Sequence, residues 1–366
     1  MTKPATGSLM IEVGLLKTAL GQILKTGAAK WGQRDIAQVR LYGDATEFRM
    51  TSIRPAPRYQ LTAIFGEGDV VTEGPFDQCI AIDQLQAALN GRPSDEWLTI
   101  EYANDETTIR QGRREITKRH FVGPLPMVEH EYAFAIADLG HDRAWRKLVD
   151  AADNDYIHAV LAGIHAKEVD GYLHLMAADG CRLGYLEGPP MDLAFKGWSA
   201  TYPAEMFRHV PAGARLALCN PAPLEHVGIL RYEIGHGIEI LALADLIDGQ
   251  YPDLAQIIPE RDRRVVLQAQ DVLEAAAYAK KYGKDGCLTK ITPEGIVVPS
   301  QSGQATWNHY DLDLGGEEYA FNGEYLAWAA KGNDQLCLEL GGVEDSACVH
   351  DDALTLVIMP MVTGGY

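Results

Sequence analysis

The stretch FNGEYLAWAAKG, residues 321–332, has the features of a short helix that starts behind an asparagine and stops at a glycine. Asn322 is of a residue type that often caps a helix N-terminus, and Gly332 is of the type that ends helices. The apolar residues between them recur at helical spacing. The stretch therefore predicts a helix that packs one face against a core.

Two similar stretches occur earlier in the chain, IDQLQAALNG at 82–91 and YPAEMFRHVPAG at 202–213. The candidate start residues of the three helices are Asp83, Pro203 and Asn322, which lie 120 and then 119 positions apart. A near-constant period of this length indicates an internal repeat. The sequence therefore predicts a fold built from three copies of one unit of about 120 residues.

Each copy also contains an earlier amphipathic helix pattern. The three segments are GLLKTALGQIL (14–24), AWRKLVDAA (144–152) and DVLEAAAYAKK (271–281). In the first, Leu16, Leu20, Ile23 and Leu24 share one face at spacings of three and four.

The second helices are followed by short runs rich in β-branched and apolar residues, which predict strands, and two proline-containing stretches divide the copies: FVGPLP (121–126) and DGQYPDLAQIIPE (248–260). We predict an α+β fold of three repeated domains, each with two helices packed on antiparallel sheets, at residues 1–126, 127–251 and 252–366.

The composition is that of an acidic globular protein. Its 366 residues are 47% hydrophobic and 23% charged, with a net charge of −19. This charge argues against non-specific binding of the whole molecule to polyanions or membrane surfaces. No apolar run approaches membrane-spanning length, and no secretory signal pattern is seen. Six cysteines without a CxxC pair favour reduced, buried thiols, so we expect a cytoplasmic protein.

No pattern of catalytic residues stands out. Phosphate-binding glycine loops, the HExxH metal motif, the EF-hand pattern and the GxSxG nucleophile motif are all missing. His141-Asp142 and His350-Asp351-Asp352 could bind a metal, but their polar surroundings are more typical of a solvated turn. We therefore expect no metal, no cofactor and no enzymatic activity. An enzyme with a dispersed active site stays open as an alternative.

Basic residues concentrate on the predicted helices of this acidic chain. They are Lys17, Lys25, Lys30, Arg143, Arg146, Lys147, Arg208, Lys280, Lys281, Lys284 and Lys331. Helices with one apolar face and one basic face could line a polyanion surface through phosphate contacts alone. Ordinary solvated helix faces would give the same pattern.

Four blocks of the chain resemble the bacterial sliding clamp, the beta subunit of DNA polymerase III. They are LHLMAADGCRLGY (173–185), LADLIDGQYPDLAQIIPE (243–260), YAFNGEYL (319–326) and LVIMPM (356–361). They occur in the order of that family and with similar spacing. The first 125 residues resemble the family more weakly, through IAIDQLQAALNG and IRQGRREITKRHFVGPLP.

The resemblance implies a head-to-tail homodimer that closes as a ring around double-stranded DNA. Helices would line the hole and hold DNA without sequence readout, with the basic residues above facing it. It implies that polymerases and repair proteins dock through short linear peptides, and that a clamp loader opens the ring. No membrane partner is implied. The alternative is a scaffold of the same fold that binds such peptides without encircling DNA.

The resemblance also implies a peptide-binding groove between the second and third domains. The residues carried over to it are Leu161, Gly180, Cys181, Arg182, Leu183, Pro252, Ile257, Leu288, Asn322, Tyr325, Ser346, Val357, Ile358, Met359, Pro360 and Met361. Apolar anchors with a few polar groups suit an extended peptide. Without the resemblance, Leu161, Leu183, Val357 and Ile358 would be interpreted as plain core.

Two departures from the family stand out. Cys181 replaces a usual histidine, and five residues, 362–366, follow the MPM block.

Overall fold

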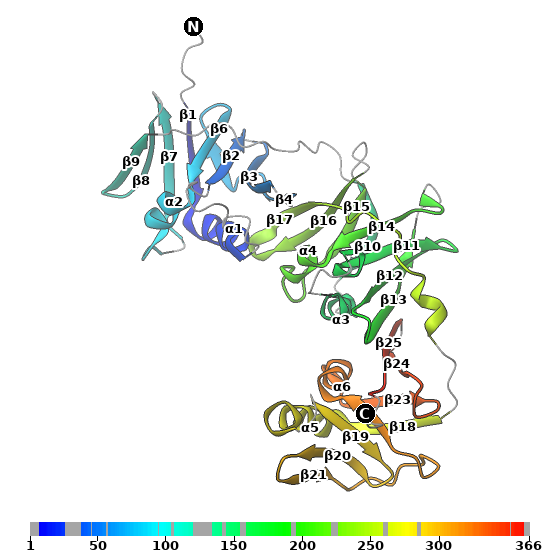
Figure 1. Ribbon diagram of the computed structural model, residues 1–366. Helices are drawn as coiled ribbons and strands as arrows, with labels where there is room; N and C mark the ends of the chain where they lie inside the picture. The colour runs from blue at the N-terminus through cyan, green and yellow to red at the C-terminus, as the bar shows by residue number, and fades with distance from the viewer. Residues whose placement is uncertain are drawn as a thin grey trace. The chain divides into compact units, whose positions relative to one another are not determined.

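The structure is a computed structural model that describes residues 7–25, 38–44, 46–55, 58–93, 95–103, 106–119, 134–140, 144–153, 159–191, 195–220, 226–258, 263–283, 287–351 and 353–361. The chain forms two compact units. The first comprises residues 1–142 and 205–246, and the second comprises residues 143–204 and 247–366. In the described residues, each unit contains one eight-stranded sheet and one smaller sheet (Figure 1).

The first unit is built on antiparallel strands. In spatial order, its five-stranded sheet comprises β5 (Val70–Thr72), β1 (Gly7–Glu12), β7 (Trp97–Ala103), β8 (Glu106–Gln111) and β9 (Arg114–Arg119). Its eight-stranded sheet comprises β10 (Phe134–Gly140), β15 (Leu216–Asn220), β16 (Val227–Ile234), β17 (Ile238–Asp245), β4 (Arg58–Phe65), β3 (Phe48–Pro55), β2 (Gln38–Gly43) and β6 (Phe76–Ala81). Its helices are α1 (Val13–Lys25), α2 (Ile82–Leu89) and α4 (Ala204–Arg208), of which Ala204 falls in the second unit.

The second unit repeats this plan. Its eight-stranded sheet comprises β14 (Ser199–Pro203), β11 (Gly163–Val169), β12 (Tyr172–Ala178), β13 (Arg182–Pro190), β25 (Leu354–Ile358), β24 (Ala347–Asp351), β23 (Gln335–Leu340) and β18 (Arg263–Gln268). Its four-stranded sheet comprises β21 (Gly303–Trp307), β20 (Gly295–Ser300), β19 (Leu288–Thr292) and β22 (Tyr319–Asn322). Its helices are α3 (Ala144–Ala151), α5 (Ala269–Tyr282) and α6 (Gly323–Ala330), with the short helices η1 (Ala159–Ala162) and η4 (Leu254–Ile257).

Each eight-stranded sheet joins strands from two sequence repeats. In the first unit, β17 of the second repeat pairs antiparallel with β4 of the first. In the second unit, β25 of the third repeat pairs in the same way with β13 of the second, from Arg182 opposite Ile358 to Leu186 opposite Leu354. The compact units therefore cut across the repeats, because an unbroken ladder of backbone hydrogen bonds crosses from one repeat to the next. The domain boundaries at 126 and 251 stay predictions.

The α+β class and the repeated helices that the sequence predicts are confirmed. Asn322 caps α6 as expected, because its side-chain oxygen accepts a hydrogen bond from the Glu324 backbone N–H at 2.9 Å. Asp83 is not a cap: the residue before α2 is Ala81, and Asp83 lies inside the first turn. The middle copy is shorter than expected, since Pro203 ends strand β14 and α4 has only five residues.

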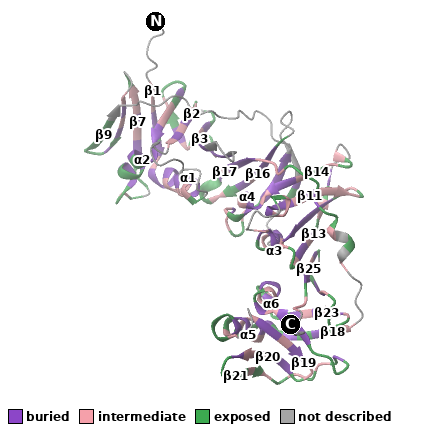
Figure 2. Ribbon diagram, in the orientation of Figure 1, coloured by how far each residue is buried: buried purple, intermediate pink, exposed green. Residues whose placement is uncertain are grey.

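The cores lie between the sheets and the helices. Trp145 of α3 and Phe321 of β22 are among the largest fully buried side chains. Gly184 of β13 allows α3 to approach the sheet, because a Cβ there would lie 2.7 Å from Leu148 Cδ2. Figure 2 shows buried residues along β16, β17 and β13, and exposed residues on the β8–β9 hairpin and on one side of α5.

All six cysteines are free thiols, as the sequence predicts. Their expected burial is correct for Cys219 and Cys348, whereas Cys79, Cys287 and Cys337 are half-buried. Cys181 is exposed. It lies in a turn at the end of the β12–β13 hairpin and not inside a strand, which explains why burial was the wrong expectation for it.

No helix among the described residues is long and apolar enough to cross a membrane.

The cap of α6 gives a stability prediction. We expect Asn322→Ala to lower the free energy of unfolding by about 1 kcal/mol, because the Glu324 N–H loses its acceptor. Asn333→Ala is the matched control: Asn333 follows the same helix, and among the described residues only its backbone N–H makes a hydrogen bond, to the Ala330 carbonyl. Chemical denaturation followed by circular dichroism measures both changes. Equal effects from the two variants would contradict the assigned cap.

Candidate functional site

The turn between β12 and β13 is held by one carboxylate. Asp179 Oδ1 accepts hydrogen bonds from the backbone N–H groups of Cys181 and Arg182, both at 3.0 Å. Asp179 Oδ2 accepts from Arg182 Nε at 2.8 Å. Gly180 has a φ of +86°, a conformation that favours glycine. The Asp-Gly pair thus fixes the backbone of Cys181 at the surface and aims the Arg182 side chain.

Arg182 lies against two aromatic rings of α6. Its guanidinium carbon is 4.9 Å from the centre of the Tyr325 ring and 5.1 Å from that of Trp328. Both contacts are within the range of a cation–π interaction. Tyr325 also forms a side-chain hydrogen bond with Cys181, and burial together with the nearby Asp179 carboxylate raises the pKa of Tyr325 to about 12. Tyr325 is therefore neutral at physiological pH.

The segment Met359-Pro360-Met361 is tied down on two sides. Met359 N–H donates to the Cys181 carbonyl at 2.8 Å, and Met361 N–H donates to the Ala320 carbonyl at 2.8 Å. Pro360 forms an isolated bridge with Phe321 of β22. The side chain of Met359 is nevertheless 43% exposed. The segment thus presents flexible apolar side chains on a fixed backbone, next to Cys181 and α6.

Residues that are neighbours in the sequence point to opposite faces of the eight-stranded sheet. Leu183 and Val357 lie opposite each other in β13 and β25 and pack in a buried cluster with Ala178 and Cys348. Leu254 and Ile258, at the start and just after the end of η4, cover this cluster. Arg182 and Ile358, the next pair along, point to the other face, and Ile358 is fully buried there.

The remaining residues predicted for the groove have separate positions. Leu161 lies half-buried in η1, Pro252 is exposed, Leu288 is buried in β19, and Ser346 is half-buried. Asn322 is occupied as the cap of α6. Ile257 lies in η4, but its side chain is outside the described residues. The residues that the structure gathers at one surface are Cys181, Arg182, Tyr325 and Met359. The groove itself stays a prediction.

Several residues at this surface, or in the apolar cluster on the other face of the sheet, have no place in the predicted groove. Asp179 orders the turn, Trp328 supports Arg182, and Ala178, Leu254 and Ile258 complete the apolar cluster. The Asp-Gly pair in the sequence is a signal for Asp179. The spacing of three between Tyr325 and Trp328 is a signal for Trp328, because such residues share a helix face.

The predicted DNA-facing residues are distributed over both units. Lys17 and Lys25 lie on α1, and Arg208 ends α4. Arg146 and Lys147 lie on α3, Lys280 and Lys281 lie on α5, and Lys331 follows α6. Lys30, Arg143 and Lys284, together with His141, Asp142, Asp352 and the tail 362–366, lie outside the described residues.

Some of these cations already have partners. Lys147 Nζ donates to the Ala329 carbonyl of α6 at 2.9 Å, and its burial lowers the pKa of the ammonium group. Lys280 pairs with Glu324 at 2.7 Å. Lys17 Nζ donates to the Arg92 carbonyl at 2.5 Å. Their assignment to a DNA surface stays a prediction, and the Lys147 side chain is half-buried.

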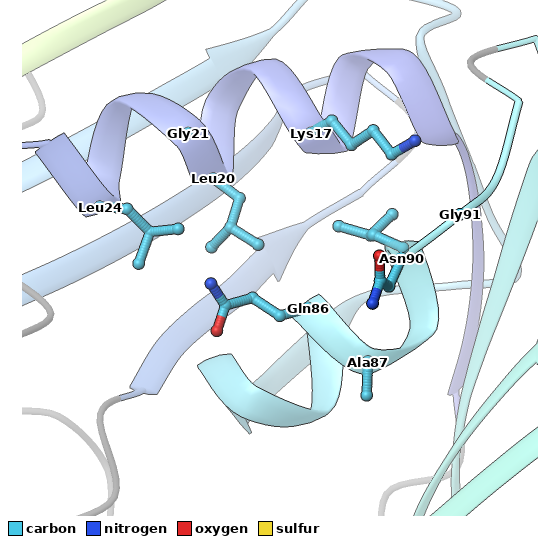
Figure 3. Close-up of a pocket in the computed structure, with 9 residues that line it drawn as sticks. Lys17, Leu20, Gly21, Leu24, Gln86, Ala87, Asn90 and Gly91 are labelled. Atoms are coloured by element: carbon cyan, nitrogen blue, oxygen red, sulfur yellow. The ribbon is translucent and has the colours of Figure 1, made fainter.

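A shallow cavity of about 520 Å³ lies between α1 and α2 (Figure 3). Leu20 and Leu24 of α1 line one side, while Gln86, Ala87 and Asn90 line the other. Lys17 lies at its rim.

The fold matches solved sliding clamps over nearly the whole chain. A Pseudomonas aeruginosa sliding clamp (DNA polymerase III subunit beta) bound to griselimycin superposes with a TM-score of 0.80 and 18% identity, covering 98% of this chain and 100% of that one. A Bacillus subtilis sliding clamp gives 0.78 and 17%, covering 98% and 100%. A Helicobacter pylori beta clamp bound to a DNA ligase peptide gives 0.76 and 14%, covering 97% and 100%.

No family model matches the sequence, and no curated protein matches it. The chain thus has the fold of the bacterial sliding clamps, at sequence identities that establish the fold alone. The resemblance that four short blocks of sequence indicate is confirmed by the structural match.

The exposure of Cys181 gives a prediction for thiol chemistry. We expect this thiol to react with a maleimide at least about tenfold faster than the buried Cys219 and Cys348. Burial raises the pKa of the Cys219 thiol to about 11, which further suppresses its thiolate. Mass spectrometry of the modified peptides against time measures the rates, and Cys181→Ser is the control that should remove the fast phase. Equal rates at Cys181 and Cys219 would contradict this surface.

Proposed function

We propose that this chain is a DNA sliding clamp, a non-catalytic accessory protein that encircles duplex DNA as a homodimeric ring and tethers polymerases and repair proteins to it. The observation that carries the proposal is the construction of the two junctions between repeats. Each junction joins one strand and one helix of a repeat to one strand and one helix of the next. One strand and one helix at each end of the repeat series remain for a further junction of the same kind.

The strand part of each junction follows one rule. The second strand of an early hairpin (β4 in the first repeat and β13 in the second) pairs with the last strand of the next repeat, β17 or β25. In the third repeat, the strand that corresponds to β4 and β13 is β21. In the first repeat, the strand that corresponds to β17 and β25 is β9. Each lies at the end of its sheet. A ring closes if β21 of one copy pairs with β9 of a second copy and the reverse contact forms as well.

The helices follow a matching rule. In the first unit, Gln22 of α1 donates to the His209 carbonyl just after α4 at 2.7 Å. In the second unit, Lys147 of α3 donates to the Ala329 carbonyl of α6, and Trp328 Nε1 donates to the Lys147 carbonyl at 3.1 Å. The first helix of one repeat thus meets the second helix of the next. The two helices that remain for a further contact of this kind are α5, the first helix of the third repeat, and α2, the second helix of the first repeat.

The elements left over carry side chains suited to an interface. Tyr282, at the end of α5, is 48% exposed. Its ring lies 4.9 Å from that of Tyr278, which in turn lies 6.3 Å from that of Trp307 at the end of β21. This aromatic row connects α5 to the free edge strand. Aromatic residues of this kind are enriched in protein interfaces.

DNA would be held by non-specific contacts between its phosphates and the basic residues of the helices. The net charge of −19 would keep DNA off the rest of the surface. Such contacts weaken with salt and read no sequence, which suits a protein that slides. A clamp loader would be needed to open the ring, and a cytoplasmic location would follow from this role.

The docking site for partner peptides would be the surface around Cys181, Arg182, Tyr325 and Met359. The Helicobacter pylori clamp was solved with a DNA ligase peptide bound, and its fold matches this chain. An extended peptide with apolar anchors would meet exposed apolar side chains and the Arg182 guanidinium here. Methionine side chains adapt to partners of different shape.

The docking surface gives a binding prediction. We expect Tyr325→Ala and Met361→Glu each to weaken the binding of a polymerase C-terminal peptide by at least about tenfold, because they remove an aromatic anchor or place a charge in an apolar site. Fluorescence anisotropy measures the affinity. Tyr172→Ala is the matched control, since Tyr172 is 52% exposed on β12 away from this surface. Unchanged affinity in both test variants would refute the site.

The ring gives a prediction for assembly and DNA retention. We expect the protein to be a dimer at micromolar concentration, and Tyr282→Glu to shift it to monomer, because a charge would be buried at the α5 contact. Sedimentation velocity measures the state, with Tyr172→Glu as the control for an added surface charge. After loading by a clamp loader, the ring should stay on closed circular DNA and leave linear DNA. A monomer that still binds polymerase peptides would favour the scaffold instead.

A further inference from the structure

One face of the sheet β5-β1-β7-β8-β9 exposes large apolar side chains. Val71 of β5 is 48% exposed, Met10 of β1 is 39% exposed and Trp97 of β7 is 45% exposed. Met10 lies directly opposite Val71, and Trp97 lies opposite Glu12, two residues along β1 from Met10. Residues two apart in a strand share a face, so the three side chains form one patch across three neighbouring strands. We call this set the first-sheet patch.

The patch is not needed to build the sheet. The opposite face carries the buried residues Leu9, Ile11, Val70, Leu98 and Ile100, which form the core. Polar residues at the exposed positions would leave this core unchanged, so the sheet does not require the exposed apolar side chains. Exposed apolar patches of this kind mark interaction sites more often than chance.

The third repeat supplies an internal comparison. Val13 N–H donates to the Glu96 carbonyl, and Ala269 N–H donates to the Asp334 carbonyl, so Trp97 corresponds to Gln335. The same backbone arrangement therefore forms with a glutamine in place of the tryptophan. Among the described residues, strand β5 also has no counterpart in the third repeat, because β18, which corresponds to β1, is the last strand of its sheet. The tryptophan and the extra strand are additions to the repeated plan.

Acidic side chains surround the patch. Glu12 is opposite Trp97, and Glu73 continues β5 next to Ser8, to whose carbonyl its backbone N–H donates at 3.0 Å. Arg110 is on the same face, but it is held by Glu101 at 2.7 Å and Glu115 at 3.0 Å. Among the described residues, neither Glu12 nor Glu73 has a cationic partner. The rim of the patch thus attracts positive charge.

The outer edge of β5 is open to pairing. Within the part of the chain that the structure describes, β5 pairs with β1 alone and forms the end of its sheet. An extended segment could add to such an edge through backbone hydrogen bonds and place side chains beside Val71. Apolar side chains in the segment would cover the patch, and flanking cations would meet the acidic rim.

We propose that the first-sheet patch, with the open edge of β5, docks an extended segment of a partner protein in which Lys or Arg residues flank apolar ones. This site is separate from the surface around Tyr325 and does not depend on ring closure or on DNA binding.

The test uses the full chain and a labelled heptapeptide with lysine pairs on both sides of a Val-Leu-Val centre. Fluorescence anisotropy measures its affinity for the unmodified protein and for Trp97→Gln, the variant that copies the third repeat. We expect Trp97→Gln to weaken binding at least about fivefold, with an unchanged circular dichroism spectrum and melting temperature. Tyr172→Gln is the control for loss of an exposed aromatic residue, and Tyr325→Ala is the control for the other surface. Both should bind the heptapeptide as the unmodified protein does.

Three outcomes would overturn the proposal. Equal binding by Trp97→Gln and the unmodified protein would remove the patch from the contact. Equal affinity for an all-lysine heptapeptide would assign the binding to charge alone. Self-association of the unmodified protein that Trp97→Gln abolishes, without any effect of that variant on peptide binding, would make the patch a contact between copies. A heptapeptide with glutamate pairs in place of lysine should bind at least about fivefold more weakly, because the acidic rim repels it, and equal binding would contradict the role of the rim.

Discussion

The antiparallel pairing of β13 with β25 is the contact on which the second unit depends. It joins two strands that are far apart in the sequence, from the second and third repeats, through backbone hydrogen bonds, and it places Arg182 opposite Ile358. The turn before β13, the segment after β25 and helix α6 come together only because this register is fixed. A shift of β25 by one residue would turn Val357 out of the buried cluster that it forms with Leu183, and would move Arg182 away from Tyr325.

The same contact positions the segment that follows β25. LTLVI forms the strand that crosses from one repeat to the next, and Met359-Pro360-Met361 continues it between Cys181 and Ala320. An apolar segment near a chain end is held here by pairing on both sides. Its exposed methionine therefore lies on a rigid support, as the peptide-docking site that we propose would require.

Local patterns predicted most helices, because an apolar stripe and a glycine stop are local features. They failed where tertiary contacts override them. Pro203 suits a helix start, but pairing of β14 with β11 extends the strand through it and leaves α4 short. Asp83 suits a cap, but β6 runs directly into α2 and leaves no place for it. The sequence predicts that basic residues concentrate on the helices. It does not predict that Lys147 donates to a carbonyl of α6, because that carbonyl lies 182 residues away in the chain.

By itself, the sequence determined the α+β class, the threefold repeat and the four blocks that resemble the sliding clamp, because periodicity and short motifs are properties of neighbouring residues. The tertiary structure alone decided which residues meet. Strand alternation places Val357 and Ile358 on opposite faces of the sheet. Asp179 and Trp328 lie at the surface around Tyr325. Strand pairing places Val71, Met10 and Trp97 on one face of three neighbouring strands. Strand register is set by long-range pairing, and single local patterns do not encode it.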